Sequence, residues 1–263
     1  MTVNEKTLRK NRWQTVILLL IIIVLTYVSS AITSFNFVDG LVTIPKAIGW
    51  MFSNLMVTQE TLDKLPTILE KLAETTFMSI AATTIAAVVS LFLGVFGSKT
   101  TKVNNFLSVF ARFIASVSRN IPVVAWSLVL LLSFGQNSVT GFLALFVGTV
   151  GFLTRAFIES IDEASQSSVE ALTATGATYF QIVGKAVIPQ CLPQMISWVL
   201  FMVETNIRNA TLVGILTGTG IGYTFDMYYK MLNYNAVALV TLCIVITVII
   251  VDLMSNYVRK VIL

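Results

Sequence analysis

Residues 170–176 read Glu-Ala-Leu-Thr-Ala-Thr-Gly, and Ile188-Pro189 follows twelve residues later. This polar segment lies between two apolar stretches of membrane length, 141–158 and 195–216. Its alanines let another backbone approach closely, Gly176 permits a turn that a Cβ would hinder, and Pro189 lacks an amide donor. The pattern predicts a short helical hairpin: a small-residue helix, a glycine break, a second helical stretch and a proline stop. Such a hairpin is suited to being held by another protein.

The composition around this segment is that of a membrane protein. Of the 263 residues, 56% are hydrophobic and 11% charged, whereas a soluble domain carries about 25% charged residues. A membrane-spanning helix needs about 20 apolar residues. Six stretches qualify: 13–31, 75–96, 121–134 with a backward extension through 106–117, 141–158, 195–216 and 236–257. The predicted fold class is therefore an all-α membrane protein, a polytopic bundle of six transmembrane helices.

The positive charges predict the orientation of this bundle. With the N-terminus in the cytoplasm and alternating spans, the inner segments hold twelve Lys and Arg and the outer segments four. The remaining cation, Arg208, lies inside the fifth span. Because cytoplasmic loops of membrane proteins are enriched in Lys and Arg, both termini are expected in the cytoplasm, as is the hairpin. The net charge of +4 reflects this topology, and no basic–aromatic patch indicates nucleic acid.

The segments before the second span allow alternatives. The basic start and first apolar run also fit a cleaved signal peptide, but the run is long and residues 27–31 make a poor cleavage site, which favours a retained helix. Between the first two spans, leucines recur at helical spacing and predict a short interfacial helix over 63–71. That helix would be a docking surface for an extracytoplasmic partner or an amphipathic linker.

Several kinds of chemistry are excluded by the residues present. The sequence has no histidine, which removes the usual proton shuttle and metal ligand. Cys191 and Cys243 lie in or beside apolar stretches and are interpreted as small buried hydrophobes. No Gly-x-x-x-x-Gly-Lys-Ser/Thr motif occurs, so the chain is not expected to hydrolyse ATP itself. We expect no catalytic residue, no metal site and no cofactor bound by this chain.

The fifth span carries the charges that are most costly to place in a membrane. Glu204 and Arg208 are four residues apart and share one helix face. Either Arg208 lines a translocation pathway and attracts an oxyanion, or the two form a structural ion pair. Asn206 faces another direction and is a weaker pathway candidate that can bond across helices. Arg112 and Arg119 are expected to mark the cytoplasmic start of the third span and not the substrate path.

A glycine-rich turn follows the fifth span. Gly218, Gly220 and Gly222 lie in a Gly-Thr-Gly-Ile-Gly run. No lysine follows the run and topology places it outside, so it is not a phosphate-cradling loop. It is interpreted as a sharp reversal or re-entrant element, with a role in an external gate or simply as a close-packed turn.

At this level of detail the chain resembles a known family. Glu170-Ala171, Gly176 and Pro189 match the spacing Glu-Ala-Ala, three residues, Gly, nine residues and Ile-x-Leu-Pro of the transmembrane subunits of ABC importers. Leu172, Ala186 and Ile188 depart from that pattern. The chain also resembles phosphonate-type permeases at residues 119–122, 157–162 and 204–210. The turn at 217–222 resembles the turn of that family too, with threonines in place of two glycines. The resemblance covers roughly residues 70 to 258, and methionine-type permeases share much of this architecture.

The resemblance implies a domain organisation. Residues 1–12 would be a cytoplasmic N-terminus, 13–34 the first transmembrane helix, 35–74 an extracytoplasmic loop and 75–263 the permease core. Within that core, the loop 159–190 would contain the coupling helix that sits in a groove of an ATPase subunit. Glu170, Ala171, Gly176 and Pro189 would then couple the chain to ATP hydrolysis.

The resemblance also implies partners and a substrate. We expect two ABC ATPase subunits that hold ATP and Mg²⁺, an extracytoplasmic substrate-binding protein, membrane lipid and a second permease subunit, either a copy or a related chain. The assembly would import a phosphonate or related phosphorus oxyanion across the inner membrane of a prokaryote by alternating access. The alternatives are the same machine carrying methionine or another anion, and a stand-alone secondary transporter or membrane sensor.

Overall fold

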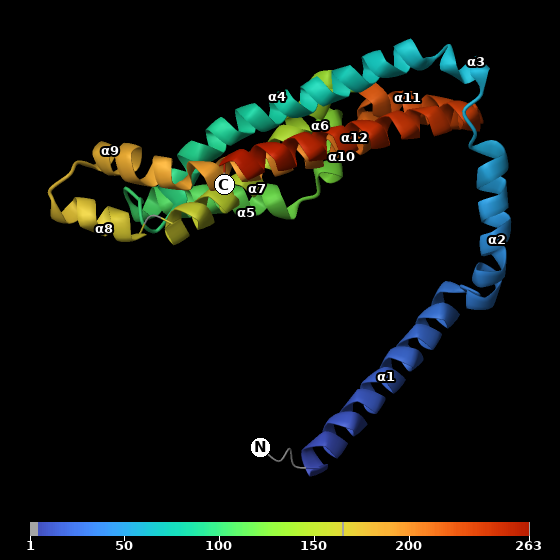
Figure 1. The fold of residues 1–263 in the computed structure, drawn as a ribbon, viewed down its shortest axis with the longest axis horizontal. Coiled ribbons are helices and arrows are strands. Elements are labelled where there is room, and N and C mark those ends of the chain that lie inside the picture. Colours follow the sequence, from blue (N-terminus) through green and yellow to red (C-terminus); the bar gives the residue numbers. More distant parts are fainter. Residues whose placement is uncertain (1–4, 165, 263) are drawn as a thin grey trace. The chain divides into compact units, whose positions relative to one another are not determined.

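The structure, a computed structural model, describes residues 5–164 and 166–262 and divides into two compact units, residues 1–55 and 56–263 (Figure 1). The described residues form helices and connecting turns, without strands. The first unit contains α1 (Glu5–Thr33) and α2 (Phe37–Asn54). The amide of Phe35 donates to the carbonyl of Ser30 at 3.0 Å in the turn between them. The first predicted span therefore corresponds to α1.

The second unit holds the remaining helices. They are α3 (Gln59–Leu62), α4 (Leu65–Gly97), α5 (Asn105–Asn120), α6 (Val123–Phe134), α7 (Ser138–Ala164), α8 (Gln166–Ala174), α9 (Tyr179–Ile182), a π-helical turn η1 (Val183–Val187), α10 (Ile188–Thr217), α11 (Gly220–Lys230) and α12 (Tyr234–Ile262). In the described part of the chain, five helical segments are long and apolar enough to cross a membrane, and the bent pair α5–α6 makes up to six. The prediction of an all-α membrane protein with six spans is confirmed in this form.

The region expected to be an extracytoplasmic loop, 35–74, is largely helical. It contains α2, α3 and the first turns of α4. Pro45 lies inside α2. The interfacial helix predicted at 63–71 is not a separate element either, because these residues mostly belong to the start of α4. There Ile68 and Leu72 are buried against α11 and α12, so this helical face packs inside the protein.

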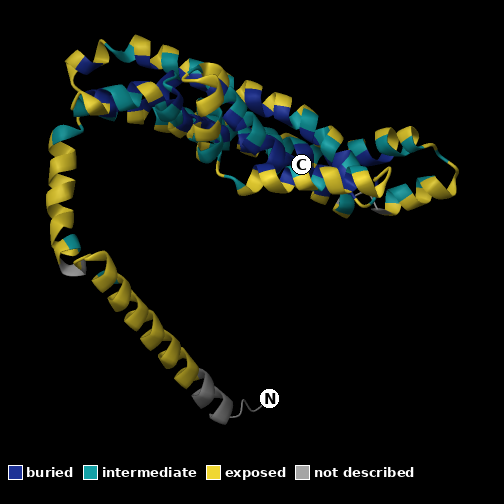
Figure 2. Cartoon of the chain, turned by 180° about the vertical axis from the view of Figure 1, so that it is seen from behind, coloured by how far each residue is buried: buried dark blue, intermediate teal, exposed yellow. Residues whose placement is uncertain are grey.

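The second unit is built around α7. This helix packs against α4, α5, α6 and α10, and its Leu145, Leu153 and Ile161 are fully buried. Figure 2 shows the buried residues gathered where these helices meet, with exposed residues on their outer faces. The exposed faces remain strongly apolar, as expected for side chains that meet lipid.

The third predicted span is broken. Its two halves, α5 and α6, meet at an angle of 95° around Ile121-Pro122. Proline cannot donate the amide hydrogen bond of a continuous helix. The bend between α5 and α6 lies against two glycines of α7. A Cβ on Gly148 would lie 2.6 Å from the side chain of Val123, and a Cβ on Gly151 would lie 2.5 Å from the amide nitrogen of Arg119. Close contact between α7 and the corner therefore requires glycine.

We predict that Gly151→Ala lowers the free energy of unfolding by about 1–3 kcal/mol, because the new methyl group overlaps backbone atoms that cannot move cheaply. Gly184→Ala is the control, since a Cβ there meets nothing within 4 Å and alanine is the better helix former. Thermal unfolding in one detergent measures both variants. Equal melting temperatures for Gly151→Ala and Gly184→Ala would contradict the close contact.

Candidate functional site

The predicted hairpin is present and begins with α8. Glu170, Ala171 and Ala174 are exposed on this helix. The helix ends in a paired hydrogen-bond motif: the amide of Ala177 donates to the carbonyl of Leu172 at 3.2 Å, and that of Gly176 donates to Thr173 at 3.0 Å. This arrangement requires a left-handed residue after the helix, and Gly176 has φ +77°. The prediction of a glycine turn is confirmed.

The second arm of the hairpin starts at Thr178, the cap of α9. Its amide donates to the side-chain oxygen of Gln181 at 2.9 Å, which completes a capping box. Tyr179 follows, and its hydroxyl donates to the carbonyl of Thr101 at 2.9 Å. Thr101 belongs to the loop between α4 and α5. The hairpin is thus hydrogen-bonded to a segment 78 residues earlier in the chain.

Pro189 does not stop the helix, contrary to the prediction. The chain runs from α9 through η1 into α10, with Pro189 in the first turn of α10. The amide of Ile188 donates to the carbonyl of Val183, five residues back. A proline ring clashes with the carbonyl four residues before it in a regular α-helix. The wider π-helical turn accommodates that carbonyl, so helix and proline coexist.

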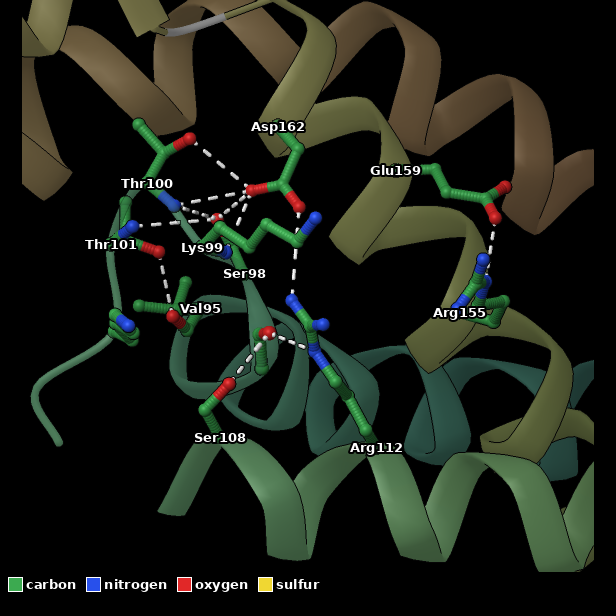
Figure 3. Close-up of polar contacts among 12 residues, drawn as sticks. Val95, Ser98, Lys99, Thr100, Thr101, Ser108, Arg112, Arg155, Glu159 and Asp162 are labelled. Atoms are coloured by element: carbon green, nitrogen blue, oxygen red, sulfur yellow. Dashed lines mark hydrogen bonds and ion pairs between the residues drawn. The ribbon is translucent and has the colours of Figure 1, made fainter. Parts of the chain in front are cut away.

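The 98–101 segment beside the hairpin is organised by one carboxylate, Asp162 of α7 (Figure 3). Its Oδ1 accepts hydrogen bonds from the hydroxyl of Ser98 at 2.5 Å, the amide of Lys99 at 2.8 Å and both the amide and hydroxyl of Thr100 at 3.2 Å. Hydrogen bonds to an ionised acceptor are roughly twice as strong as neutral ones. Asp162 therefore fixes the end of α4 to the end of α7.

Arg112 of α5 completes this junction. Its Nε donates to the carbonyl of Gly97 at 2.7 Å, and its guanidinium lies 3.9 Å from the second oxygen of Asp162. Ser108 donates to the same carbonyl at 3.1 Å. We call Ser98, Thr101, Arg112, Asp162 and Tyr179 the junction. It connects α4, α5 and α7 to the start of the α9–α10 segment.

Asn206, a tentative pathway residue, lies in the interior. It is fully buried, and its amide nitrogen donates to the hydroxyls of Thr83 at 2.9 Å and Thr149 at 2.7 Å. Both hydroxyls donate onward to backbone carbonyls of their own helices, so they are free to accept from the amide. Asn206 thus joins α10 to α4 and α7.

Glu204 and Arg208 form the ion pair that their spacing predicts, with Nη1 and Oε1 2.7 Å apart. The side chain of Glu204 is 12% exposed and that of Arg208 47%. In this single chain the guanidinium lies at the surface of α10. The pair therefore does not share a site with Asn206, which points to the protein interior.

The glycine run forms a tightly packed reversal. Gly218 ends α10 with φ +69°, and Gly220 starts α11 with φ +59°. A Cβ on Gly220 would lie 2.2 Å from the hydroxyl oxygen of Thr75, and one on Gly222 would lie 2.0 Å from the carbonyl oxygen of Thr211. The sharp reversal is confirmed, and α11 is held directly against α4 and α10.

Sequence reasoning identified the hairpin but not the junction that holds it. Asp162 was noted only as the last residue of the 157–162 stretch that resembles phosphonate-type permeases, and Tyr179 was not noted at all. The only local signal was a run of polar residues, Ser98 to Thr101, directly after an apolar span. Such a run is common wherever a span ends, so its partner was visible only in the structure.

The comparisons with known proteins agree with this geometry. The family model for the binding-protein-dependent transport system inner membrane component matches residues 86–262. The chain belongs to this family. It is accordingly a multi-pass protein of the inner membrane, and α7, the junction and the hairpin all lie within the matched range.

Individual relatives include permeases for different solutes. The phosphite transport system permease protein PtxC of Stutzerimonas stutzeri is 32% identical over 72% of this chain and 69% of its own. A probable D-methionine transport system permease protein, MetI of Haemophilus influenzae, is 28% identical over 66% of this chain and 86% of its own. An inward-facing structure of the MetNI methionine ABC transporter has the same fold, with a TM-score of 0.67, 21% identity and coverage of 74% and 96%.

Asp162→Asn tests the junction. We expect the substitution to lower the free energy of unfolding by about 1.5–3 kcal/mol, because the neutral amide oxygen is a weaker acceptor than the carboxylate and the amide nitrogen would present donors to Arg112. Glu163→Gln removes the same charge from the adjacent exposed position and is expected to change stability by less than about 0.5 kcal/mol. Thermal unfolding of both variants in one detergent gives the comparison. A destabilisation by Glu163→Gln as large as that by Asp162→Asn would contradict the assigned role.

Proposed function

We propose that this chain is the membrane-spanning subunit through which phosphite, a phosphonate or a related phosphorus oxyanion is imported. The observation that carries the substrate class is the 32% identity to a phosphite transport permease over most of both chains. Methionine permeases match at 28% and define the alternative substrate. Their lower identity makes methionine the second candidate.

The proposal includes partners that this chain lacks by itself. Two ATPase subunits would bind ATP and Mg²⁺, a binding protein would deliver the oxyanion from outside, and a second permease, a copy or a relative, would complete the path. The full sequence contains no nucleotide-binding motif, which supports a separate ATPase. The exposed, small-residue surface of α8 supports a close protein contact. This chain would contribute no catalytic residue and hold no cofactor.

The junction supports a specific route for coupling. When the ATPase subunits close, they would displace the hairpin α8–α9. Tyr179 would transmit this displacement to Thr101, and the hydrogen bonds of Asp162 and Arg112 would carry it to the ends of α4, α5 and α7. Tyr179 is a positioning residue in this scheme because it acts through the backbone of Thr101. The helices that move together are those that pack around α7.

The other candidate residues have separate parts in the proposal. Glu204 and Arg208 would face the second permease or the transport path, where a guanidinium favours an oxyanion. Asn206 would hold α10 against α4 and α7, so that the three move as one body. The reversal at Gly218–Gly222 would anchor the external end, because its close contacts leave little room for local motion.

The substrate prediction is tested by uptake in cells that lack this subunit and are complemented with the gene. We expect phosphite or a simple phosphonate to be imported and to compete with each other, while a large excess of methionine has no effect. Competition by methionine with no effect of phosphorus oxyanions would favour the second candidate. Purification of the tagged chain without an ATPase would contradict the ABC assembly and favour a stand-alone transporter.

The coupling route is tested by Tyr179→Phe, which removes the hydroxyl and keeps the ring. Loss of a hydrogen bond worth about 0.5–1.5 kcal/mol is expected to lower the number of substrates imported per ATP hydrolysed by about two- to tenfold. The control is Tyr223→Phe on α11, an exposed position outside the junction. Transport and ATPase activity are measured together in proteoliposomes. An unchanged ratio for Tyr179→Phe would rule out this route.

A further inference from the structure

A cavity between α5 and α7 is lined by three arginines. Its volume is about 60 Å³, which is well above the roughly 10–15 Å³ that a single water needs. Arg112 and Arg119 come from α5, and Arg155 comes from α7. The lining residues are Arg112, Ala115, Ser116, Arg119, Arg155 and Ile158. We call this the arginine pocket.

The arginines converge because of helical spacing. Arg112, Ser116 and Arg119 are separated by four and three residues, so they share one face of α5. The exposed phenylalanines of α5, Phe106, Phe110 and Phe113, lie on a different face of the helix. Ala115 and Ile158 are almost fully buried and form the floor between the two helices. The polar face of α5 therefore points along α7 and away from the face suited to lipid.

The position of Arg119 along α7 makes its positive charge costly in free energy unless the side chain has a partner, water or a ligand beside it. Its backbone lies against Gly151, which is the middle residue of α7. Because α7 is long and apolar enough to cross the membrane, we expect its middle to lie near the centre of the bilayer. An ionised side chain at that depth faces a partner, an aqueous path or a ligand. The sequence placed Arg119 at the start of a span, whereas in the structure it lies at the end of α5, beside the bend to α6.

The available partners do not neutralise the pocket. Among the residues that the structure describes, the guanidinium of Arg119 has no hydrogen bond or ion pair. Arg155 pairs with Glu159 at 2.5 Å, and Arg112 lies 3.9 Å from Asp162 (Figure 3). By contrast, the guanidinium of Arg208 is directly paired with Glu204. Positive charge is thus less compensated in the arginine pocket than at Arg208.

A second cavity lies beside the pocket and shares Arg112, Arg155 and Ile158 with it. Its other lining residues are Lys99, Glu159, Asp162 and Glu163. Three carboxylates there offset the cations, so the field changes from strongly positive to mixed toward the end of α7. An anion would therefore be held in the arginine pocket and less strongly beyond it.

We propose that Arg112, Arg119 and Arg155 form a binding site for a tetrahedral phosphorus oxyanion in the half of the membrane domain next to the hairpin. Guanidinium groups present paired donors that match the oxygens of such an anion, and the hydroxyl of Ser116 adds a neutral donor. The oxyanion is either the transported ion or the phosphate of a lipid headgroup. The first source rests on the proposed function, and the second does not.

The test uses the full chain with its ATPase partner in nanodiscs of phosphatidylcholine, with inorganic phosphite as the probe. Arg119→Gln is the main variant, because this exposed side chain supports no other residue among those described and its loss leaves the fold intact. Phosphite affinity is expected to fall about tenfold or more, with partial recovery in Arg119→Lys, which keeps the charge but not the paired donors. Arg155→Gln is expected to act in the same direction. Lys260→Gln removes an exposed cation at the end of α12 and is the control.

A parallel measurement separates the two sources. Nanodiscs containing phosphatidylglycerol are analysed for lipid retained on the protein by native mass spectrometry. Absence of phosphite binding, together with loss of retained phosphatidylglycerol in Arg119→Gln, assigns the site to a headgroup. Phosphite affinity and lipid retention that both equal those of Lys260→Gln in the two pocket variants overturn the proposal.

Uptake of phosphite by the same wild-type complex in proteoliposomes distinguishes a failure of the proposed function from a failure of the arginine pocket. If the wild type imports no phosphorus oxyanion, the proposed function fails while the pocket is judged on binding alone. If the wild type imports phosphite and the pocket variants both bind phosphite and retain lipid normally, the pocket fails and the proposed function stands.

Discussion

The structure depends on backbones that approach each other closely along α7. Lipid chains are as apolar as leucine, so helices in a membrane are not driven together by the hydrophobic effect, and tight packing takes its place. Gly148 and Gly151 let the corner between α5 and α6 lie against α7, and Gly94 and Gly97 of α4 contact Phe157 and Ile158 of α7. These contacts leave no space for a methyl group.

Polar groups inside the bundle are arranged in two different ways. Near the middle, Asn206 uses both amide hydrogens on threonine hydroxyls that already donate to their own helices, which joins three helices without a charge. Near the hairpin, Asp162 accepts hydrogen bonds from the loop after α4 and so holds the end of α4 against the end of α7. The first arrangement is enclosed by protein, and the second is partly exposed. A transporter of this design has a fixed centre and an end that can be reached from outside the bundle.

The sequence predicted the large features because they depend on local composition and spacing. Apolar runs defined the spans, and Gly176 marked a turn whose left-handed backbone only glycine adopts easily. Helical spacing predicted the Glu204–Arg208 pair. The interpretation of Pro189 as a stop was wrong, since this residue lies within a helix. A proline shows that an amide is missing, but surrounding packing decides whether the helix continues.

Features that join distant segments were not predictable. Tyr179 reaches Thr101, and Arg119 lies beside Gly151, through packing that no pattern within either segment encodes. The same limit applies to Asn206: its ability to bond across helices was expected, but its two threonine partners were visible only in the structure. The charge of Arg119 was visible in the sequence, but its depth depends on the 95° bend between α5 and α6.

The π-helical turn η1 makes the orientation of the hairpin sensitive to chain length. A π-helical turn contains one residue more than an α-helical turn, and one residue corresponds to a rotation of about 100° around the helix axis. Deleting a single residue from Val183–Val187 would restore regular α-helix and swing Tyr179 away from Thr101. Insertions in the turn after Gly176 would leave that orientation unchanged. The span from Tyr179 to Pro189 is therefore expected to keep a constant length, in agreement with the fixed number of residues between the glycine and the proline of the family motif.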